Sequence, residues 1–463
     1  MLHIEEIKHA PAKFESFIYP FFDFNYQVPA SEIALLFLQN PAKKKRGEDG
    51  LYIHIPFCDT ICGFCPFVKS VGSDERVTAY LEALLREIEL TSQLVHFQDR
   101  LFSSVYFGGG TPSILSVEQL EKLTLKLRSS FLFSNDCEWS LEVEAKSMTL
   151  DKIIAAKELG FSRVSFGVQT LNHKYREMVN LTTSLDQIFS LVENLCKHIP
   201  NNNFDLLVGF PGQTIDEALK DVEYAANTGI ASISIYPLDY CMILPSIHDK
   251  IRKGSLPALS SLSCRFDMFY QCRKLLQNFF QEFNIYCYGN QYAKPCQFMF
   301  NIVYGSFFNE YVGLGCSSYS CLRGLMYQNE PSESEYIRLI GAGILPVKVA
   351  SCFQAYEKGL VFFPKLMRFS IDEYFQLQLD ISHGKRMSTL IKNGYITKND
   401  TSFLLTELGE KHYAAIMVYL FSNSQFRLYT KICEKLKANG LLDYGESLVK
   451  TRTYQYGVLT AMT

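Results

Sequence analysis

The chain has 463 residues, enough for roughly two or three domains, and 48% of them are hydrophobic against 20% charged. Lysine and arginine total 45 and aspartate and glutamate 48, so the net charge of −3 excludes a general attraction to nucleic acid or membrane surfaces. No apolar run reaches about 18 residues, so no membrane span is expected. The charged N-terminus is unlike a signal peptide, and the 14 cysteines then favour a reducing compartment, the cytoplasm.

Residues 1–45 are interpreted as an N-terminal extension. It is rich in Phe and Tyr over residues 14–26, a short helix is expected over residues 30–38, and the basic residues 43–46 are typical of a solvated linker. Aromatic residues make up 14% of the chain. They build a bulky core or line a cavity for a flat substrate, and for any single aromatic residue the core is favoured.

Three cysteines, Cys58, Cys62 and Cys65, stand at C-x3-C-x2-C in a loop after a β-prone run over residues 51–55. Thiolates at this spacing can hold a soft metal or an iron–sulfur cluster. Because a [4Fe–4S] cluster has four irons, three thiolates leave one iron open to an external ligand. Structural zinc usually takes four ligands from paired motifs, and the sequence has no partner CxxC, so a cluster is favoured over zinc or chance spacing.

From residue 51 to about residue 245, β-prone runs alternate with helical stretches. Strands are expected over residues 51–55, 104–107, 139–143, 163–167, 204–208 and 231–236, and helices over residues 77–95, 117–131, 150–159, 184–198 and 214–228. Repeated strand–helix units imply a parallel sheet. About six units predict an α/β fold built on a partial (β/α)6 barrel, with catalytic groups at the C-terminal ends of its strands.

After residue 245 the alternation fades. A long amphipathic helix is expected over residues 259–283, and strands and turns that close the barrel mouth over residues 286–324. From residue 370 the pattern is helical, with a strand-like wing at residues 390–394 and 396–408 and a further helix over residues 408–439. We therefore divide the chain into an extension (1–45), a barrel (46–250), a barrel-closing and substrate-side segment (251–369) and a small, mainly helical C-terminal domain (370–463).

Two motifs follow expected strands in the first half of the barrel. The sequence GGGTP at residues 108–112 lets a backbone approach a ligand and presents bare N–H groups, although a tight turn is the plainer alternative. Glu142 and Glu144, in LEVEA, are expected on one face of a strand end. A carboxylate there can accept hydrogen bonds from a ribose diol or an ammonium group, or can simply be solvated.

Two further polar residues belong to later strands. Gln169, in SFGVQT, carries an amide that can donate and accept at once, or can satisfy loop backbone. Asp205 begins DLLVGFPGQT in a strand whose pattern indicates burial. A buried carboxylate needs a partner, so Asp205 is a candidate ligand contact, with a structural cap as the alternative.

These five motifs, over about residues 50–320, together resemble the radical S-adenosylmethionine (SAM) superfamily. The stretch YIHIPFC-x3-C-x2-C-x-F is most similar to the branch of oxygen-independent coproporphyrinogen III oxidase, which also holds heme chaperones, anaerobic heme-opening methyltransferases and class C methyltransferases. The resemblance implies a [4Fe–4S] cluster whose open iron is chelated by SAM and whose electron cleaves SAM to a 5′-deoxyadenosyl radical. The tail resembles the winged-helix-like C-terminal domain of the same branch.

The resemblance implies site residues position by position. Cys58, Cys62 and Cys65 would be the metal ligands and the catalytic centre. Cofactor contacts would come from the following residues of the matching motifs: Tyr52, Phe64, Gly109, Gly110, Thr111, Glu142, Gln169 and Asp205. The branch has an arginine where this chain has Leu181, which leaves a basic contact to a SAM carboxylate unassigned, with Arg176 and Lys174 as candidate substitutes.

Residues that mark individual members of the branch are partly absent. The heme chaperone's histidine-asparagine-x-x-tyrosine-tryptophan stretch reads FNIVYG at residues 300–305, the oxidase's fourth cysteine is Phe67, and its GMDHFA segment reads YGNQYA at residues 288–293. These departures favour a class C methyltransferase with two SAM molecules, which would methylate an sp2 carbon of a quinone, a tetrapyrrole or a heteroaromatic acceptor. The alternatives are an oxidative decarboxylase of a porphyrinogen and a heme carrier.

The same interpretation sets expectations for partners. It expects a small-molecule substrate, an electron donor such as flavodoxin or ferredoxin, no nucleic acid and a monomer. The other eleven cysteines have no cluster-like spacing and are each expected to be small buried hydrophobes: Cys137, Cys196, Cys241, Cys264, Cys272, Cys287, Cys296, Cys316, Cys321, Cys352 and Cys433.

Overall fold

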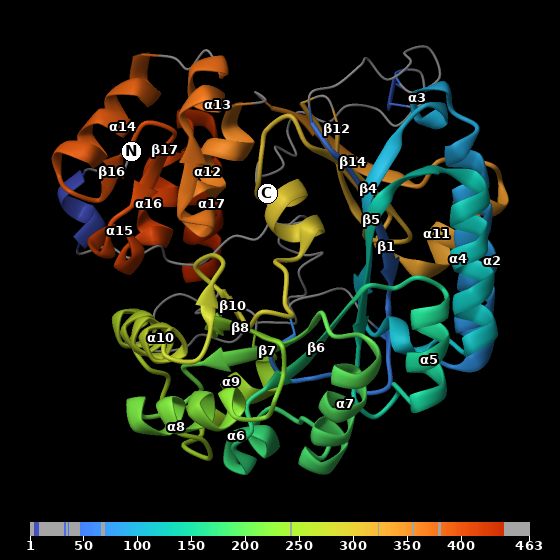
Figure 1. The fold of residues 1–463 in the computed structure, drawn as a ribbon, viewed down its shortest axis with the longest axis horizontal. Coiled ribbons are helices and arrows are strands. Elements are labelled where there is room, and N and C mark those ends of the chain that lie inside the picture. Colours follow the sequence, from blue (N-terminus) through green and yellow to red (C-terminus); the bar gives the residue numbers. More distant parts are fainter. Residues whose placement is uncertain are drawn as a thin grey trace.

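The structure, a computed structural model, describes residues 4–8, 32–33, 36, 47–65, 70–240, 243–322, 324–353, 356–377 and 381–438. Its centre is a curved, twelve-stranded sheet with helices along its outer side (Figure 1). The aromatic stretch at residues 14–26 and the basic run at 43–46 lie outside the described residues, as does most of the helix expected over residues 30–38.

Six parallel strands form the predicted partial (β/α)6 barrel, each neighbour following in chain order. They are β1 (Asp49–Ile55), β4 (Leu101–Gly109), β5 (Leu132–Val143), β6 (Arg163–Gln169), β7 (Asn202–Val208) and β8 (Ser232–Pro237). On one side β8 pairs antiparallel with β10 (Cys287–Gly289), which pairs with β9 (Gln281–Glu282). On the other side β1 pairs with a further parallel strand, β11 (Glu310–Leu314), which leads into β12 (Tyr319–Leu322), β13 (Leu325–Asn329) and β14 (Val347–Cys352).

Helices of the barrel begin where local capping is strong. A serine or threonine precedes α4 (Val117–Ser130), α7 (Leu185–His198) and α8 (Ile215–Ala226), and each start forms a capping box with a Gln or Glu three residues on. The other helices from here to residue 366 are α2 (Asp74–Ser92), α3 (Val95–Gln98), α5 (Leu150–Glu158), α6 (His173–Met178), α9 (Pro245–Arg252), α10 (Leu262–Leu276), α11 (Glu333–Gly341) and α12 (Tyr356–Leu366). None of the helices in the described part of the chain has the length and apolarity that crossing a membrane requires.

The two faces of the barrel strands differ in character. On the helix-covered face, alternate residues such as Val105, Leu141 and Phe166 are buried in the main hydrophobic core. The intervening residues on the inner face are polar or titratable, as the hydrogen bonds among Ser165, Asn203 and Ser232 indicate. Parallel sheets usually have apolar residues on both faces. This polar inner face is therefore suited to a ligand rather than to packing alone.

Two expectations for the second half of the chain are wrong. The helix expected over residues 259–283 ends at Leu276, because the residues of β9 pair with β10 instead. The strand expected at residues 390–394 is the end of helix α14 (Ile381–Lys392), and Gly394, with φ of 75°, terminates it. In addition, residues 286–324 contain a helical segment, η4 (Gln297–Val303), beside the expected strands.

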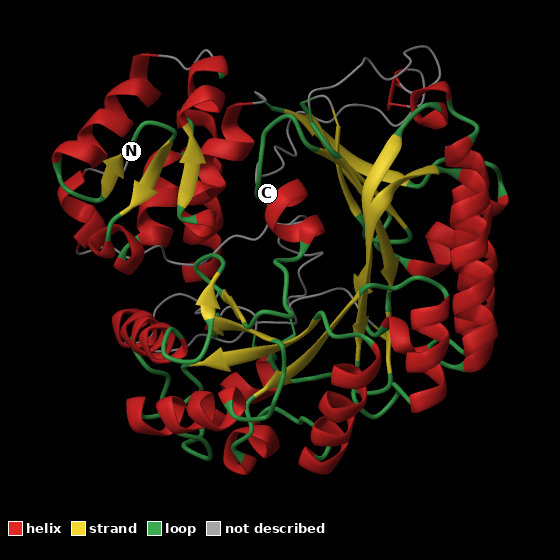
Figure 2. Cartoon of the chain, in the orientation of Figure 1, coloured by secondary structure: helices red, strands yellow, loops and turns green. Residues whose placement is uncertain are grey.

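The C-terminal part has its own small sheet flanked by helices (Figure 2). Strands β15 (Arg368–Ser370), β17 (Ser402–Leu405) and β16 (Ile396–Lys398) lie side by side, and β16 with β17 forms the expected wing hairpin. Around them lie α13 (Ile371–Gln376), α14, α15 (Glu407–Lys411), α16 (Tyr413–Leu420) and α17 (Asn423–Ala438). Buried Arg273 of α10 ties this part to the barrel through Glu410 at 3.3 Å. The division of the chain into four segments remains a prediction.

A buried ion-pair triad fastens β11 to the barrel. Arg100 is 2% exposed, and its two terminal nitrogens lie 2.7 Å from Asp49 and 2.8 Å from Glu310. Replacing Arg100 with Met is expected to lower the free energy of unfolding by about 3–5 kcal/mol, because two carboxylates would remain buried without their cation. Urea denaturation measures this loss. Arg338→Met, which removes a surface pair with Glu335, is the control and should cost less than about 1 kcal/mol.

A buried carboxyl on α2 makes stability depend on pH. Glu87 accepts hydrogen bonds from Tyr336, Asn329 and the backbone of Gly315, and burial raises its pKa to about 7. The folded chain thus keeps a proton that the unfolded chain releases near the ordinary pKa. The contribution of Glu87 is complete below the unfolded pKa and is lost as pH rises through about 7.

Relative to Glu87→Gln, the wild-type free energy of unfolding should fall by about 3 kcal/mol between pH 4.5 and pH 8. Urea denaturation across this pH range measures the difference. Because both proteins keep the other carboxyl groups whose pKa is raised, the contribution of those groups cancels in the comparison. Parallel pH curves for the two proteins would contradict this expectation.

Candidate active site at the C-terminal ends of the barrel strands

The cysteine loop is held by backbone contacts to two other segments. Cys58 ends β2 (Phe57–Cys58) and is buried, whereas Cys62 and Cys65 are half-buried. The N–H of Gly63 donates to the carbonyl of Val179 at 2.8 Å, and the carbonyl of Gly63 accepts from the N–H of residue 244 at 2.7 Å. The loop therefore lies between the segment after α6 and the start of α9, and β2 pairs with β3 (Ser70–Val71).

The glycine loop after β4 lies directly against the cysteine segment. Gly110 and Thr111 donate their N–H groups to the carbonyls of Ile55 and Phe57, both at 2.7 Å, and the N–H of Gly109 donates to Glu142 at 3.2 Å. The expectation that this loop presents bare N–H groups is therefore wrong for all three residues. The glycines instead allow close approach of the protein's own backbone.

The loop contact gives a sharp prediction for Gly110. A Cβ atom at Gly110 would lie 2.5 Å from the carbonyl oxygen of Phe57 and 2.8 Å from that of Ile55. Gly110→Ala should therefore cost about 1–3 kcal/mol of stability, because rigid backbone must shift. In Gly341→Ala, where a Cβ meets nothing within 4 Å, stability should be unchanged or slightly increased. Urea denaturation of both variants makes the comparison, and equal losses would contradict the packing argument.

Glu142 lies at the end of β5 and faces the barrel interior. Its carboxylate accepts from the hydroxyl of Tyr106 at 2.5 Å and from the N–H of Gly109 at 3.2 Å. Burial raises its pKa to about 7, with a smaller rise from the nearby Asp205. Each carboxylate oxygen still has acceptor capacity, so Glu142 can receive hydroxyl or ammonium donors from a ligand. Glu144 lies just beyond the strand, in a different network.

Asp205 and Gln169 come together across β6 and β7. Asp205 is opposite Gly167 in the register, and the side-chain amide of Gln169 folds over Gly167, where a Cβ would meet its nitrogen at 2.2 Å. Asp205 accepts from the amide of Asn203 at 2.9 Å, and burial raises its pKa to about 6. Asp205 is only half-buried, so the strand is less enclosed than its sequence indicates. Gln169 has a φ of 68°, a left-handed conformation at the strand end.

Tyr52 and Phe64 are both packed against protein groups. The ring of Tyr52 stacks on Tyr106 and on Phe298 of η4, with ring centroids 6.2 and 5.8 Å away. In the sheet register, Tyr52 and Tyr106 are level with Ser140, which precedes Glu142 on the same face of β5. Phe64 lies in a separate hydrophobic cluster with residues of α6 and α9, including Tyr175. The described contacts of both residues are structural, and their contact with a cofactor stays a prediction.

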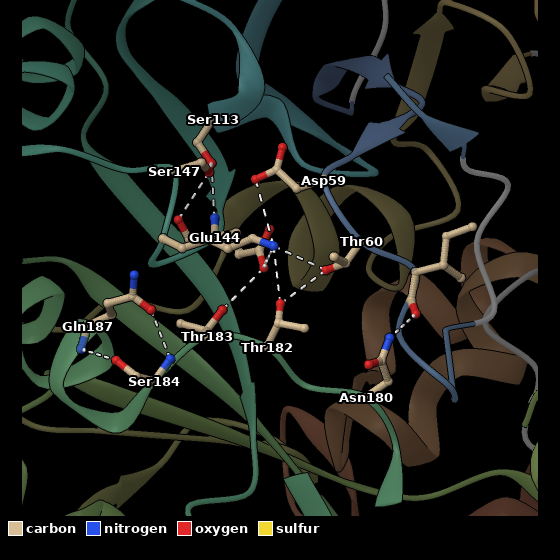
Figure 3. A network of polar contacts seen from close by, with 12 residues as sticks. Asp59, Thr60, Ser113, Glu144, Ser147, Asn180, Thr182, Thr183, Ser184 and Gln187 are labelled. Carbon is tan, nitrogen blue, oxygen red and sulfur yellow. Dashed lines mark hydrogen bonds and ion pairs between the residues drawn. The ribbon is translucent and has the colours of Figure 1, made fainter. Parts of the chain in front are cut away.

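The two candidate substitutes for the missing arginine have other partners. Arg176 is buried and donates to the carbonyls of Val168, Thr170 and Thr183. Lys174 pairs with Glu217 at 3.2 Å and donates to the hydroxyl of Tyr175. A different cation, Lys146, lies beside the cysteine loop, where it contacts Thr60 and Asp59. Figure 3 labels these two residues of the loop.

Sequence reasoning missed several residues of the inner face. Tyr106 holds Glu142, Asn203 holds Asp205, and the buried Arg163 lowers the pKa of both carboxyl groups against the effect of burial. Tyr106 is two residues after Ser104 in the same strand, so the two side chains are expected on the same, inner face of the sheet. No sequence signal tells which residue of β5 stands beside it, because that depends on register between strands.

The donor set of the cysteine loop fits an iron–sulfur cluster. Three soft thiols lie in one loop at the barrel end that carries Glu142. Among the described residues, no three His, Cys, Asp or Glu side chains are gathered around the position of one metal ion. Cysteine thiolates are the ligands that hold iron–sulfur clusters, so this donor set is compatible with a [4Fe–4S] cluster.

The remaining cysteines mostly match their expectation. Six are buried: Cys272, Cys287, Cys296, Cys316, Cys321 and Cys433. Cys137 and Cys264 are half-buried, and Cys241 lies outside the described residues. Cys196 and Cys352 are exposed, so the expectation of burial is wrong for these two.

Comparison with known proteins defines the class. The description "Radical SAM superfamily" matches residues 52–225, which include the cysteine loop and the barrel strands from β4 to β7. The heme chaperone HemW of Buchnera aphidicola subsp. Acyrthosiphon pisum is 32% identical over 273 residues, 58% of this chain and 69% of that protein. The oxygen-independent coproporphyrinogen III oxidase of Salmonella typhimurium is 33% identical over 225 residues, 48% of this chain and 49% of that protein.

A solved structure has the same fold. The coproporphyrinogen III oxidase HemN from Escherichia coli superimposes with a TM-score of 0.71 at 22% identity, over 90% of this chain and 98% of that chain. The chain belongs to the radical SAM superfamily, in the branch of oxygen-independent coproporphyrinogen oxidase and its relatives. This membership implies a [4Fe–4S] cluster and SAM as cofactors.

Proposed function

We propose that this chain is a radical SAM enzyme that acts on a tetrapyrrole. In this proposal Cys58, Cys62 and Cys65 hold the [4Fe–4S] cluster, which supplies the electron that cleaves SAM to a 5′-deoxyadenosyl radical. The carrying observation is that the cysteine segment, the glycine loop and Glu142 are joined by hydrogen bonds at one end of the barrel. The tetrapyrrole class is supported by the names of the relatives, a heme chaperone and a coproporphyrinogen III oxidase.

Within the proposal, the chain's own residues bind and orient SAM. Glu142 accepts from ligand hydroxyl or ammonium groups, and Asp205 and Gln169 offer further polar contacts from β7 and β6. Gly109, Gly110 and Thr111 set the distance between the glycine loop and the cysteines through the hydrogen bonds to Ile55 and Phe57. The inner face of the barrel keeps reactive groups away from bulk water.

Oxidative decarboxylation of a porphyrinogen is the reaction that we propose. It is supported by the coproporphyrinogen III oxidase relative at 33% identity. The radical that SAM would supply would take a hydrogen atom from the substrate, and the substrate would then lose carbon dioxide and pass one electron to an acceptor. One SAM molecule suffices for each abstraction. The differences from the heme chaperone and oxidase motifs favour methyl transfer, but the relatives reported above give that reaction no support.

A heme carrier is a second candidate. It is favoured by the match to the heme chaperone HemW, which extends over 69% of that protein. The stretch at residues 300–305, which lies in and after η4, lacks the histidine and tryptophan of the heme chaperone motif. Heme binding would therefore use other residues of this chain.

The test is anaerobic turnover by the reconstituted protein. SAM, dithionite, coproporphyrinogen III and an electron acceptor are supplied, and products are identified by mass spectrometry. Carbon dioxide with 5′-deoxyadenosine, both absent in the variant with all three loop cysteines changed to Ala, supports the decarboxylase. S-adenosylhomocysteine with a methylated porphyrinogen contradicts it and restores the methyltransferase. A heme Soret band without substrate turnover contradicts it in favour of the carrier.

A further inference from the structure

One lysine ammonium joins the cysteine loop to two neighbouring loops. Figure 3 shows the labelled residues around it, which include Asp59, Thr60 and Thr182. Lys146 lies in the turn after β5, and its Nζ donates to the hydroxyl of Thr60 at 3.1 Å and to that of Thr182 at 3.2 Å. The same Nζ lies 3.4 Å from Glu144 and 3.8 Å from Asp59. The side chain of Lys146 is only 17% exposed, so these contacts are screened less than those of a surface pair.

The segments that meet at Lys146 also contact one another. Thr60 and Thr182 share a hydrogen bond of 3.2 Å, and Asn180 donates its amide to the carbonyl of Ile61 at 3.3 Å. Asp59, Thr60 and Ile61 fill the interval between Cys58 and Cys62. Each residue of this interval is thus tied either to Lys146 or to the segment at residues 180–182.

Two carboxylates share the Lys146 ammonium. The carboxylates of Asp59 and Glu144 both lie within 4 Å of the ammonium, and each raises the free energy of the other when both are charged. Burial raises the pKa of Glu144, Lys146 lowers it, and Asp59 adds a smaller rise. A neutral side chain at residue 146 would leave two carboxylates facing each other. The loop between Cys58 and Cys62 would then be pushed away from the end of β5.

We propose that Lys146 is a positioning residue that holds the segment between Cys58 and Cys62 in the conformation that receives the cluster. It acts through its contacts to Asp59 and Thr60. Loss of the ammonium loosens the segment in the metal-free protein and speeds loss of the cluster from the loaded protein. The proposal rests on the assignment of the three cysteines as cluster ligands, but its first test needs no cluster.

The first test is amide hydrogen exchange of the metal-free protein. Lys146→Met should raise the exchange rate of residues 59–63 by about 10-fold, the loss expected for hydrogen bonds to a charged group. Lys146→Arg should restore most of the protection, because it keeps a cation of similar reach. Lys122→Met is the matched control, since Lys122 also pairs with a carboxylate, Glu82, but joins α4 to α2 on the surface.

The second test measures loss of the cluster from the reconstituted protein. With excess chelator, the cluster absorbance should decay about 10-fold faster in Lys146→Met than in the wild type, and Lys146→Arg and Lys122→Met should decay as the wild type does. The proposal would be overturned if Lys146→Met had the same exchange and cluster decay rates as the wild type. It would also be overturned if Lys122→Met changed both rates as much as Lys146→Met does. Failure of Lys146→Arg to restore protection would also overturn it. If this chain gives the expected exchange rates in the three variants but has no activity on a tetrapyrrole, only the proposed function is refuted.

Discussion

Replacing Cys58, Cys62 and Cys65 together with Ala is expected to reduce reconstituted iron from about four atoms per chain to background. It should also abolish formation of 5′-deoxyadenosine, because the electron that cleaves SAM comes from the cluster that these thiolates hold. Iron analysis and cluster absorbance measure the bound cluster, and mass spectrometry measures the 5′-deoxyadenosine. Since Cys58 is buried beside β1, thermal unfolding of the metal-free variant must also be compared with that of the metal-free wild type.

The matched control removes three other cysteines. Cys196, Cys264 and Cys352 are exposed or half-buried and have no cluster-like spacing, so their joint change to Ala should leave iron content and SAM cleavage unchanged. If this control loses the cluster, or if the loop variant keeps it, the cluster is bound elsewhere and the assignment of the loop fails.

Replacing Glu142 with Gln is expected to weaken SAM binding by about 10- to 100-fold, since a charged acceptor is lost from a partly dehydrated site. The wild type should also bind SAM more tightly as pH rises. Burial raises the pKa of Glu142 to about 7, and only the ionised carboxylate accepts from all its ligand donors. Below that pKa the dissociation constant should rise by about 10-fold for each pH unit, and Glu142→Gln should lack this dependence.

Anaerobic titration calorimetry of the cluster-loaded protein measures both effects. Glu87→Gln provides the matched control, because the pKa of Glu87 is also raised to about 7 but its carboxyl lies on α2, bonded to Tyr336. That variant should bind SAM with wild-type affinity and wild-type pH dependence. An unchanged dissociation constant in Glu142→Gln would remove Glu142 from the SAM site.

Most of the barrel could be predicted from the sequence, because its strands and helices alternate over short distances and carry their own signals. Every expected barrel strand is present, and the capping boxes at Ser116, Ser184 and Thr214 start helices close to the expected positions. The parallel strand β11 was not predicted as such, since its partner β1 lies far earlier in the chain: Asp49 pairs with Glu310. Local propensity also failed where β9 pairs with β10 and shortens α10.

The candidate site divides in the same way. Glu142 and Gln169 could be located because each lies at the end of a strand whose pattern is visible in the sequence, and Asp205 because it is a carboxylate inside such a strand. Tyr106 and Lys146 could not, because one depends on the register between β4 and β5 and the other on three loops that meet in space. The glycine loop could be recognised in the sequence, but the acceptors of its N–H groups could not. The carbonyls of Ile55 and Phe57 come next to the loop only when the chain folds.

The central claim is that this chain holds a [4Fe–4S] cluster with one iron open to SAM. Electron paramagnetic resonance of the anaerobically reduced, reconstituted protein, recorded with and without SAM, tests it most directly. The expected result is a [4Fe–4S]+ signal whose g values shift when SAM is added, with no signal in the variant lacking all three loop cysteines. A cluster signal that SAM leaves unchanged, or one that survives loss of Cys58, Cys62 and Cys65, would contradict the claim.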